Sequence, residues 1–145
     1  MSDIPETLDG PQKLVYESAL AGNAEAMFMV ASFYHNGDNV EQSDEKSFEW
    51  CLKAAEAGNT NAMNNLGALY ASGAGVKQSL QDAAKWFIKA AEAGLPDAQF
   101  NVALLYENGF GVEQDPNEVG KWLSRAASQG YEPALEHIAK MYGRR

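Results

Sequence analysis

The sequence predicts an all-α fold, a right-handed α-α superhelix (solenoid) of antiparallel helix pairs with about eight helices. Three observations predict it. A 36-residue repeat runs through most of the chain, each repeat contains two helical patterns, and only a short turn separates the second helix of one repeat from the first helix of the next. Short connections make consecutive helices antiparallel neighbours, and stacked pairs bury apolar faces that one pair would leave exposed.

The repeat is visible as columns of like residues that recur every 36 positions. The alanine, tyrosine, tryptophan and glycine columns are Ala26, Ala62, Ala98 and Ala134; Tyr34, Tyr70, Tyr106 and Tyr142; Trp50, Trp86 and Trp122; and Gly22, Gly58, Gly94 and Gly130. They define three complete repeats, 24–59, 60–95 and 96–131, with partial repeats at 12–23 and 132–145. Residues 1–11 are expected to form a flexible N-terminal segment, and residues 12–145 the repeat domain.

Each complete repeat opens with a first-type helix, expected over about 60–72 in the middle repeat. Ala62, Leu66 and Tyr70 recur at the spacing of one helix face, which is the face expected to be buried. A neighbouring column holds only small residues: Ala31, Gly67, Ala103 and Ala139. Glycine costs about 1 kcal/mol relative to alanine inside a helix, so this column indicates that another helix passes close by.

A glycine loop and a capping residue separate the first-type helix from the second-type helix. Gly73 and Gly75 can adopt positive φ and end the helix, and Asn39 is the expected substitute for the second glycine in the first repeat. The second-type helix is expected to start at a residue whose side chain can cap it: Ser43, Ser79 or Asp115. A lone second-type helix (about 12–21) opens the array, and a lone first-type helix (132–142) closes it.

Composition excludes several function classes. The 20 acidic and 11 basic residues give a net charge of −9, which repels phosphate backbones, so nucleic-acid binding is not expected. The N-terminus lacks a basic and an apolar signal region, no apolar run approaches the roughly 20 residues of a membrane helix, and Cys51 is the single cysteine. We therefore expect a cytoplasmic protein without membrane insertion, although an exported protein with a trimmed signal would look similar.

Two motifs resemble a known repeat. Leu66-Gly67-x2-Tyr70 and Ala83-x3-Phe87 match part of the tetratricopeptide pattern. The period of 36, the Gly-x-Gly-Val loop and the ending Trp-x3-Ala-Ala-x2-Gly at residues 86–94 are similar to the Sel-one-like repeat family, over roughly 14–142. The resemblance implies a protein-binding adaptor or scaffold. One cysteine-rich branch of that family is linked to penicillin binding, and the single cysteine here does not match it.

The outward columns of the first-type helices are the candidate partner-binding residues. In tetratricopeptide arrays the equivalent columns line the concave groove, and the resemblance implies the same here, although the convex face stays open as an alternative. From the first to the last first-type helix they are Glu25, Phe28, Met29, Ser32 and His35; Asn61, Asn64, Asn65 and Ala68; Asp97, Phe100, Asn101, Leu104 and Glu107; and Glu136, His137 and Lys140.

The chemistry of these columns suggests what they bind. Phe28, Phe100 and Leu104 are large apolar residues at outward positions, which favours a ligand site, or a core position if the helices rotate slightly. A second group carries amides that can bond to a peptide backbone or form ordinary polar surface: Asn64, Asn65 and Asn101.

The margins of the groove are acidic, which favours a neutral or basic partner: Glu25, Asp97, Glu107 and Glu136. Asn65 and Asn101 resemble the asparagine columns of tetratricopeptide carboxylate clamps. The lysine and arginine residues of such clamps are missing, so recognition of a terminal carboxylate is not expected.

The inventory of reactive residues argues against an enzyme. His35 and His137 lie far apart in the repeat array, Cys51 falls in the column of Phe87 and Leu123, and no phosphate-binding loop is present, so no catalytic residue, metal or cofactor is expected. Two function classes remain. One is an adaptor or scaffold that binds a peptide or protein segment in its groove, and the other is an inhibitor or immunity protein that blocks a toxin or effector enzyme. The chain is expected to be a monomer or to self-associate weakly.

Overall fold

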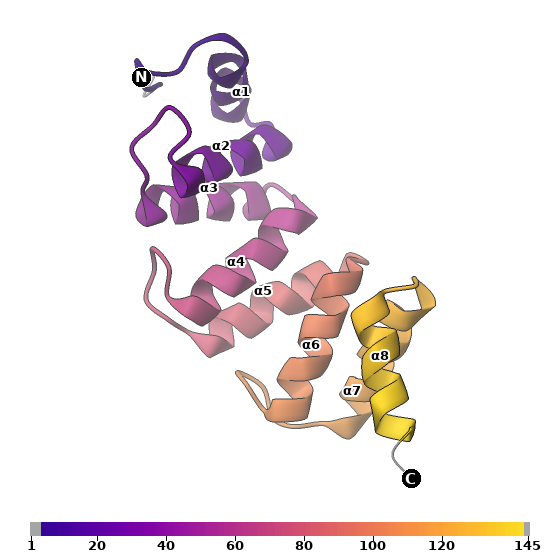
Figure 1. The fold of residues 1–145 in the computed structure, drawn as a ribbon. Helices are drawn as coiled ribbons and strands as arrows, with labels where there is room; N and C mark the ends of the chain where they lie inside the picture. The colour runs from indigo at the N-terminus through magenta and orange to yellow at the C-terminus, as the bar shows by residue number, and fades with distance from the viewer. Residues whose placement is uncertain (1–3, 144–145) are drawn as a thin grey trace. The chain divides into compact units, whose positions relative to one another are not determined.

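The computed structural model describes residues 4–143, and this part of the chain is all-α with eight helices (Figure 1). In chain order they are α1 (Gly10–Leu20), α2 (Ala24–Asn36), α3 (Asp44–Glu56), α4 (Thr60–Ser72), α5 (Leu80–Glu92), α6 (Pro96–Asn108), α7 (Pro116–Ser128) and α8 (Glu132–Tyr142). The predicted fold class is confirmed, and the first-type helix of the middle repeat has the predicted bounds.

Contacts divide the chain into two compact units. The N-terminal unit ends at Gln78 and holds α1 to α4, and the C-terminal unit begins at Ser79 and holds α5 to α8. In each unit, helices that follow one another in sequence pack together, including the pairs α2–α3 and α6–α7. The handedness of the whole superhelix stays a prediction.

The first-type helices begin and end at residues that the local chemistry requires. The side chains of Asn23 and Asn59 accept hydrogen bonds from the backbone N–H groups of Ala26 and Ala62, which caps α2 and α4. All three complete first-type helices end at a glycine in the left-handed region, such as Gly73 with φ of 77°.

The second-type helices carry the predicted caps. Ser43 and Ser79 accept hydrogen bonds from backbone N–H groups three residues later, and Asp115 accepts one from Asn117. Asn39 has a φ of 58°, as expected of a residue that replaces a glycine of the loop.

The second glycine of the loop has a packing role that the sequence did not reveal. A Cβ atom on Gly75 would lie 2.1 Å from the Asp44 carbonyl oxygen at the start of α3. A Cβ atom on Gly111 would lie 2.2 Å from the Leu80 carbonyl oxygen at the start of α5. Within each unit, this loop therefore packs directly against the backbone of the preceding second-type helix, and only glycine fits there.

Small and aromatic residues share the core. Ala54, Ala90 and Ala126 are fully buried on the second-type helices. Trp50 and Trp122 are buried, and Trp86 in the same column is half-buried. The N-terminal segment is described from Ile4 onwards. Its Leu8 is buried, and residues 1–3 of the predicted flexible segment lie outside the described residues.

Candidate partner-binding groove

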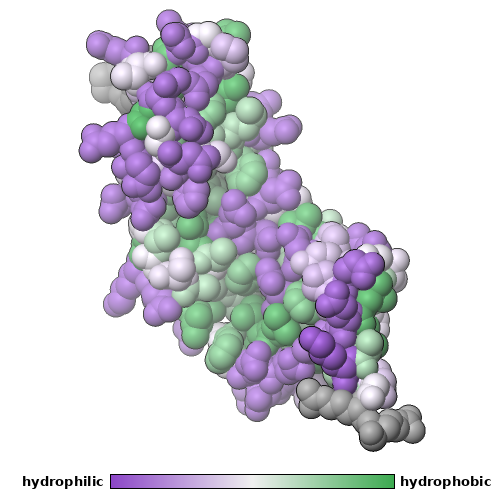
Figure 2. Space-filling view, viewed as in Figure 1, coloured by the Kyte–Doolittle hydropathy of each residue, from purple (hydrophilic) through white to green (hydrophobic). Residues whose placement is uncertain are grey.

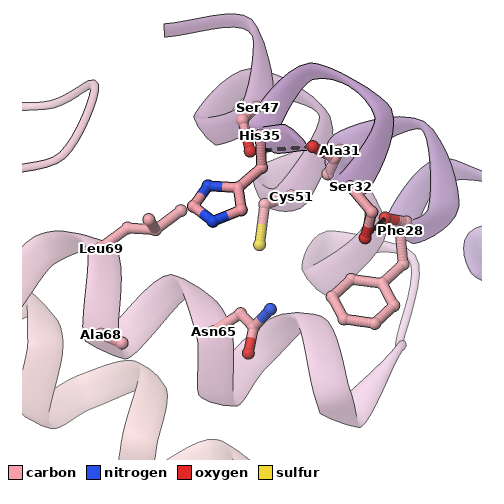
Figure 3. A pocket seen from close by; sticks show the side chains of 9 residues that line it. All are labelled: Phe28, Ala31, Ser32, His35, Ser47, Cys51, Asn65, Ala68 and Leu69. Atoms are coloured by element: carbon pink, nitrogen blue, oxygen red, sulfur yellow. Dashed lines mark hydrogen bonds between the residues drawn. The ribbon is translucent and has the colours of Figure 1, made fainter. Parts of the chain in front are cut away.

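The N-terminal unit contains a cavity of about 220 Å³ among α2, α3 and α4 (Figure 3). Its walls include five of the predicted partner-binding residues: Phe28, Ser32, His35, Asn65 and Ala68. The remaining lining residues are Ala31, Ser47, Cys51 and Leu69. The columns chosen from the repeat thus converge on one hollow site between two first-type helices, with α3 as its floor.

The floor of this cavity offers no free hydrogen-bond donor from Ser47 or Cys51, because both side chains donate to backbone carbonyl oxygens. The Ser47 hydroxyl donates to the Ala31 carbonyl oxygen at 2.9 Å, as Figure 3 shows. The Cys51 thiol donates to the Ala62 carbonyl oxygen at 3.3 Å. Burial raises the pKa of the Cys51 thiol to about 12, so the thiol is neutral at physiological pH. Such a floor suits an apolar group and does not suit nucleophilic catalysis.

The matching region of the C-terminal unit, between α6 and α8, is occupied by its own side chains. The Phe100 ring lies 5.7 Å from the Tyr131 ring and 5.9 Å from the His137 ring, measured between centroids. His137 Nε2 lies 3.1 Å from Glu107 Oε2, which bridges α6 and α8. Three predicted partner-binding residues of this unit, Phe100, Glu107 and His137, therefore contact one another or Tyr131.

Residue size explains the difference between the two regions. The columns of Ser32, Ser47 and Cys51 hold larger residues 72 positions later: Leu104, Val119 and Leu123. Val119 and Leu123 are buried, and Leu104 is half-buried. The N-terminal unit has a hollow because its three small residues leave that volume unfilled.

The other predicted residues lie around these regions. Glu25, Met29 and Asn61 are exposed and border an open hollow beside the cavity. Asn64, Asn101 and Asp97 are half-buried, and each interacts with other residues of the protein. Glu136 and Lys140 are exposed on α8. Phe28, Phe100 and Leu104 are half-buried, which lies between the two alternatives that the sequence left open.

Sequence reasoning missed the floor of the cavity. Ala31 and Cys51 occupy columns of small or buried residues, and Ser47 lies on a second-type helix, so none of them belongs to the outward columns of the first-type helices. A signal was present: comparing each column between repeats shows small residues in the first repeat where the third has leucine or valine.

The N-terminal unit also carries most of the negative charge. Residues 1–78 contain 11 acidic and 4 basic residues, whereas residues 79–145 contain 9 acidic and 7 basic residues. Hydrophilic side chains cover much of the α1–α3 region on the face in Figure 2. The unit that holds the groove therefore has a net negative charge, which attracts positively charged groups.

Within residues 4–143, no group of three or more histidine, cysteine, aspartate or glutamate side chains is arranged to hold a metal ion. No helix in the same range is long and apolar enough to cross a membrane.

Comparison with known proteins identifies the repeat. The Sel1 repeat model matches residues 24–59, 60–95 and 96–131. No functionally curated protein matches the chain in sequence. A Sel1 repeat protein from Oxalobacter formigenes is 36% identical, with a TM-score of 0.82, and the match covers 87% of this chain and 95% of that one.

Two other solved structures are similar. A protective antigen of uropathogenic Escherichia coli strains, which displays the same repeat fold, is 33% identical with a TM-score of 0.87 over 92% of this chain, but this covers only 29% of the antigen. Cysteine-rich protein B of Helicobacter pylori is 24% identical with a TM-score of 0.67, over 88% of this chain and 96% of that one, and supports the fold alone. Because the repeat model covers well over half of the sequence, the chain belongs to the Sel1 repeat family, whose repeats generally act as protein-interaction scaffolds.

Proposed function

We propose that this protein is a non-catalytic adaptor or scaffold that binds a segment of another protein in the groove of its N-terminal unit. One apolar side chain of that segment occupies the cavity among α2, α3 and α4. The observation that carries the proposal is the cavity itself, which is lined by five residues of the outward columns of the first-type helices. In the same proposal the protein acts in the cytoplasm.

The size of the cavity favours a side chain over a free small molecule. Small-molecule sites usually enclose about 300–1,000 Å³, and they add several converging polar groups. This cavity encloses about 220 Å³, and the two polar groups of its floor are bonded to backbone carbonyls. A single bulky apolar residue anchored in such a hollow is the usual centre of a protein–protein contact.

The surroundings favour a basic or neutral segment around that anchor. His35 and Asn65 lie exposed at the cavity, and Glu25 borders the adjoining hollow. With 11 acidic against 4 basic residues in this unit, an acidic segment would be repelled during approach. The expected ligand is an apolar residue with lysine or arginine nearby in sequence.

Selection from a random peptide library displayed on phage tests the proposal. Enriched peptides are expected to share one bulky apolar residue beside basic residues. Their affinities are then measured by fluorescence anisotropy for the wild type and for Ser32→Leu, which places in the cavity the residue that the C-terminal unit has at the same column. We expect Ser32→Leu to weaken binding at least about tenfold, with no fall in melting temperature.

Ser124→Leu is the matched control, because Ser124 is exposed on α7 of the other unit. It should bind like the wild type. Peptides without a shared apolar anchor, or equal binding by Ser32→Leu and the wild type, would contradict the proposal.

A further inference from the structure

Helix α8 exposes a face whose counterpart on each earlier first-type helix is buried or half-buried. Its Leu135, Ala139 and Tyr142 are spaced four and three residues apart, which places them on one side of the helix. All three are exposed, and Tyr142 is 74% exposed, whereas its counterpart Tyr34 on α2 is 4% exposed.

In a complete repeat this face is covered by the second-type helix that follows. Ala31 of α2 is buried, and its carbonyl oxygen accepts the hydrogen bond from Ser47 of α3. Ala103 of α6 is buried in the same way, in the unit where α6 packs against α7. Ala139 stands in this column of small residues, but within residues 4–143 no second-type helix follows α8. The surface is therefore shaped for a closely packed helix.

Helix α1 exposes the complementary face. It is a second-type helix by register, and three of its residues on one side are exposed: Pro11, Leu14 and Ser18. They occupy the columns of Ser47, Trp50 and Ala54, which α3 buries. Leu14 is 65% exposed, whereas Trp50 and Trp122 in the same column are 8% and 2% exposed.

Residues 4–143 thus carry both halves of a helix pair that is not completed within this described part of the chain. We propose that α1 of a second copy packs on α8 of the first, so that Pro11, Leu14 and Ser18 of one copy meet Leu135, Ala139 and Tyr142 of the other. The contact continues, between copies, the α2–α3 and α6–α7 packing already present within each unit. It joins different surfaces of the two copies, so it leaves one face of each kind free and can extend to further copies.

The net charge of −9 on each copy opposes this association. Added salt screens charges that are separated by more than about 8 Å at physiological ionic strength. The self-association is therefore expected to be weak in dilute buffer and to strengthen as salt is added.

Sedimentation velocity of the full chain, from low micromolar to near-millimolar concentration, tests the proposal. The wild type should form species that grow beyond the dimer as concentration and salt rise. Leu14→Glu and Tyr142→Glu each place a carboxylate in one half of the contact, at an exposed position where folding does not depend on the side chain. Each variant alone should be monomeric, with an unchanged circular dichroism spectrum.

The two variants mixed together give the decisive result. Leu14→Glu keeps an intact α8 face and Tyr142→Glu keeps an intact α1 face, so an equimolar mixture should form a one-to-one dimer and nothing larger. Leu20→Glu is the matched control. Leu20 is 45% exposed on α1, and its column already holds Glu56 and Glu92, so this variant should associate like the wild type.

Three outcomes would overturn the proposal. A wild type that stays monomeric at every concentration and salt shows that the faces do not pair. Loss of association in Tyr142→Glu but not in Leu14→Glu shows a symmetric contact of α8 with itself. Mixed variants that fail to dimerise show that α1 and α8 are not each other's partners.

Discussion

The groove of the N-terminal unit and the matching region of the C-terminal unit are made from the same columns of one repeat, but only the first is hollow. Ser32, Ser47 and Cys51 leave about 220 Å³ in one. In the other, leucine and valine take those columns, and Phe100 packs against Tyr131 and His137. The repeat framework therefore determines where a groove can form, and the size of a few side chains determines whether it can receive a ligand.

The largest expected effect is on the reactivity of the thiol that only the N-terminal region contains. Cys51 has a thiol with its pKa raised to about 12 by burial, and Leu123 stands in its column in the other unit. At neutral pH the native thiolate should be about 1,000-fold scarcer than in the unfolded chain. Alkylation by iodoacetamide, followed by mass spectrometry, should be slower in the native protein by a similar factor. Labelling at the unfolded rate would show that the cavity floor is open.

The same pKa predicts how stability depends on pH. Because the folded state holds the thiol proton more tightly than the unfolded state, its stabilising effect is complete below about pH 9 and is lost as pH rises towards 12. Chemical denaturation between about pH 8 and 12 should therefore show a larger loss of stability in the wild type than in Cys51→Ala, because the raised pKa values of Tyr106 and Tyr131 affect both proteins alike.

The next largest effect tests whether the close contact between the loop glycine and the preceding second-type helix stabilises both units equally. Gly75→Ala forces an unfavourable φ and a clash with the backbone of α3, and should lower the free energy of unfolding by about 2–5 kcal/mol. Gly111→Ala should cost a similar amount against α5. Gly73→Ala, with its nearest neighbour atom at 3.3 Å, should cost only about 1 kcal/mol. Urea denaturation measures all three, and a mild Gly75→Ala would contradict the close loop contact.

Phe28 and Phe100 occupy the same column of the repeat, so the cost of removing each ring shows how closely it is packed in its unit. Phe100→Ala removes contacts with Tyr131 and His137 and should destabilise the protein by about 2 kcal/mol. Phe28→Ala removes a ring that borders the cavity and should cost about 1 kcal/mol. Thermal unfolding of both variants tests this order. The reverse order would mean that Phe28 is the better packed ring.

The smallest effect concerns the Glu107–His137 bridge. Its two side chains are 36% and 26% exposed, so Glu107→Gln should change the free energy of unfolding by less than about 1 kcal/mol. Denaturation of Glu107→Gln, His137→Gln and the double variant would isolate the coupling between them. A coupling well above this limit would show that the bridge, and not Phe100, closes the C-terminal region.

The sequence predicts the framework well because the framework repeats. Thr60–Ser72 has the bounds that the pattern indicated, and Ser43, Ser79 and Asp115 cap the helices that they were expected to cap. Each feature is local in sequence and recurs every 36 residues, so the repeats reinforce one another.

The cavity and the loop packing were not predictable in the same way. Gly75 meets Asp44, 31 positions earlier, and local patterns carry no trace of such a contact. The cavity is lined by residues of α2, α3 and α4, and its volume depends on how their side chains pack together in three dimensions. Half-burial of Phe28 and Phe100 likewise depends on helix rotation, which the spacing of apolar residues leaves undetermined to within a few tens of degrees.

The contact of the second loop glycine has a bearing on how such chains evolve. Gly75 abuts the carbonyl oxygen and carbon of Asp44 and the nitrogen of Glu45, which are atoms that every amino acid has. The junction between successive modules therefore makes almost no demand on the side chains of its neighbour. A duplicated repeat can therefore be inserted without new side chains at its contact with the preceding repeat. Mutations can then change its ligand-facing residues without disturbing the packing between repeats.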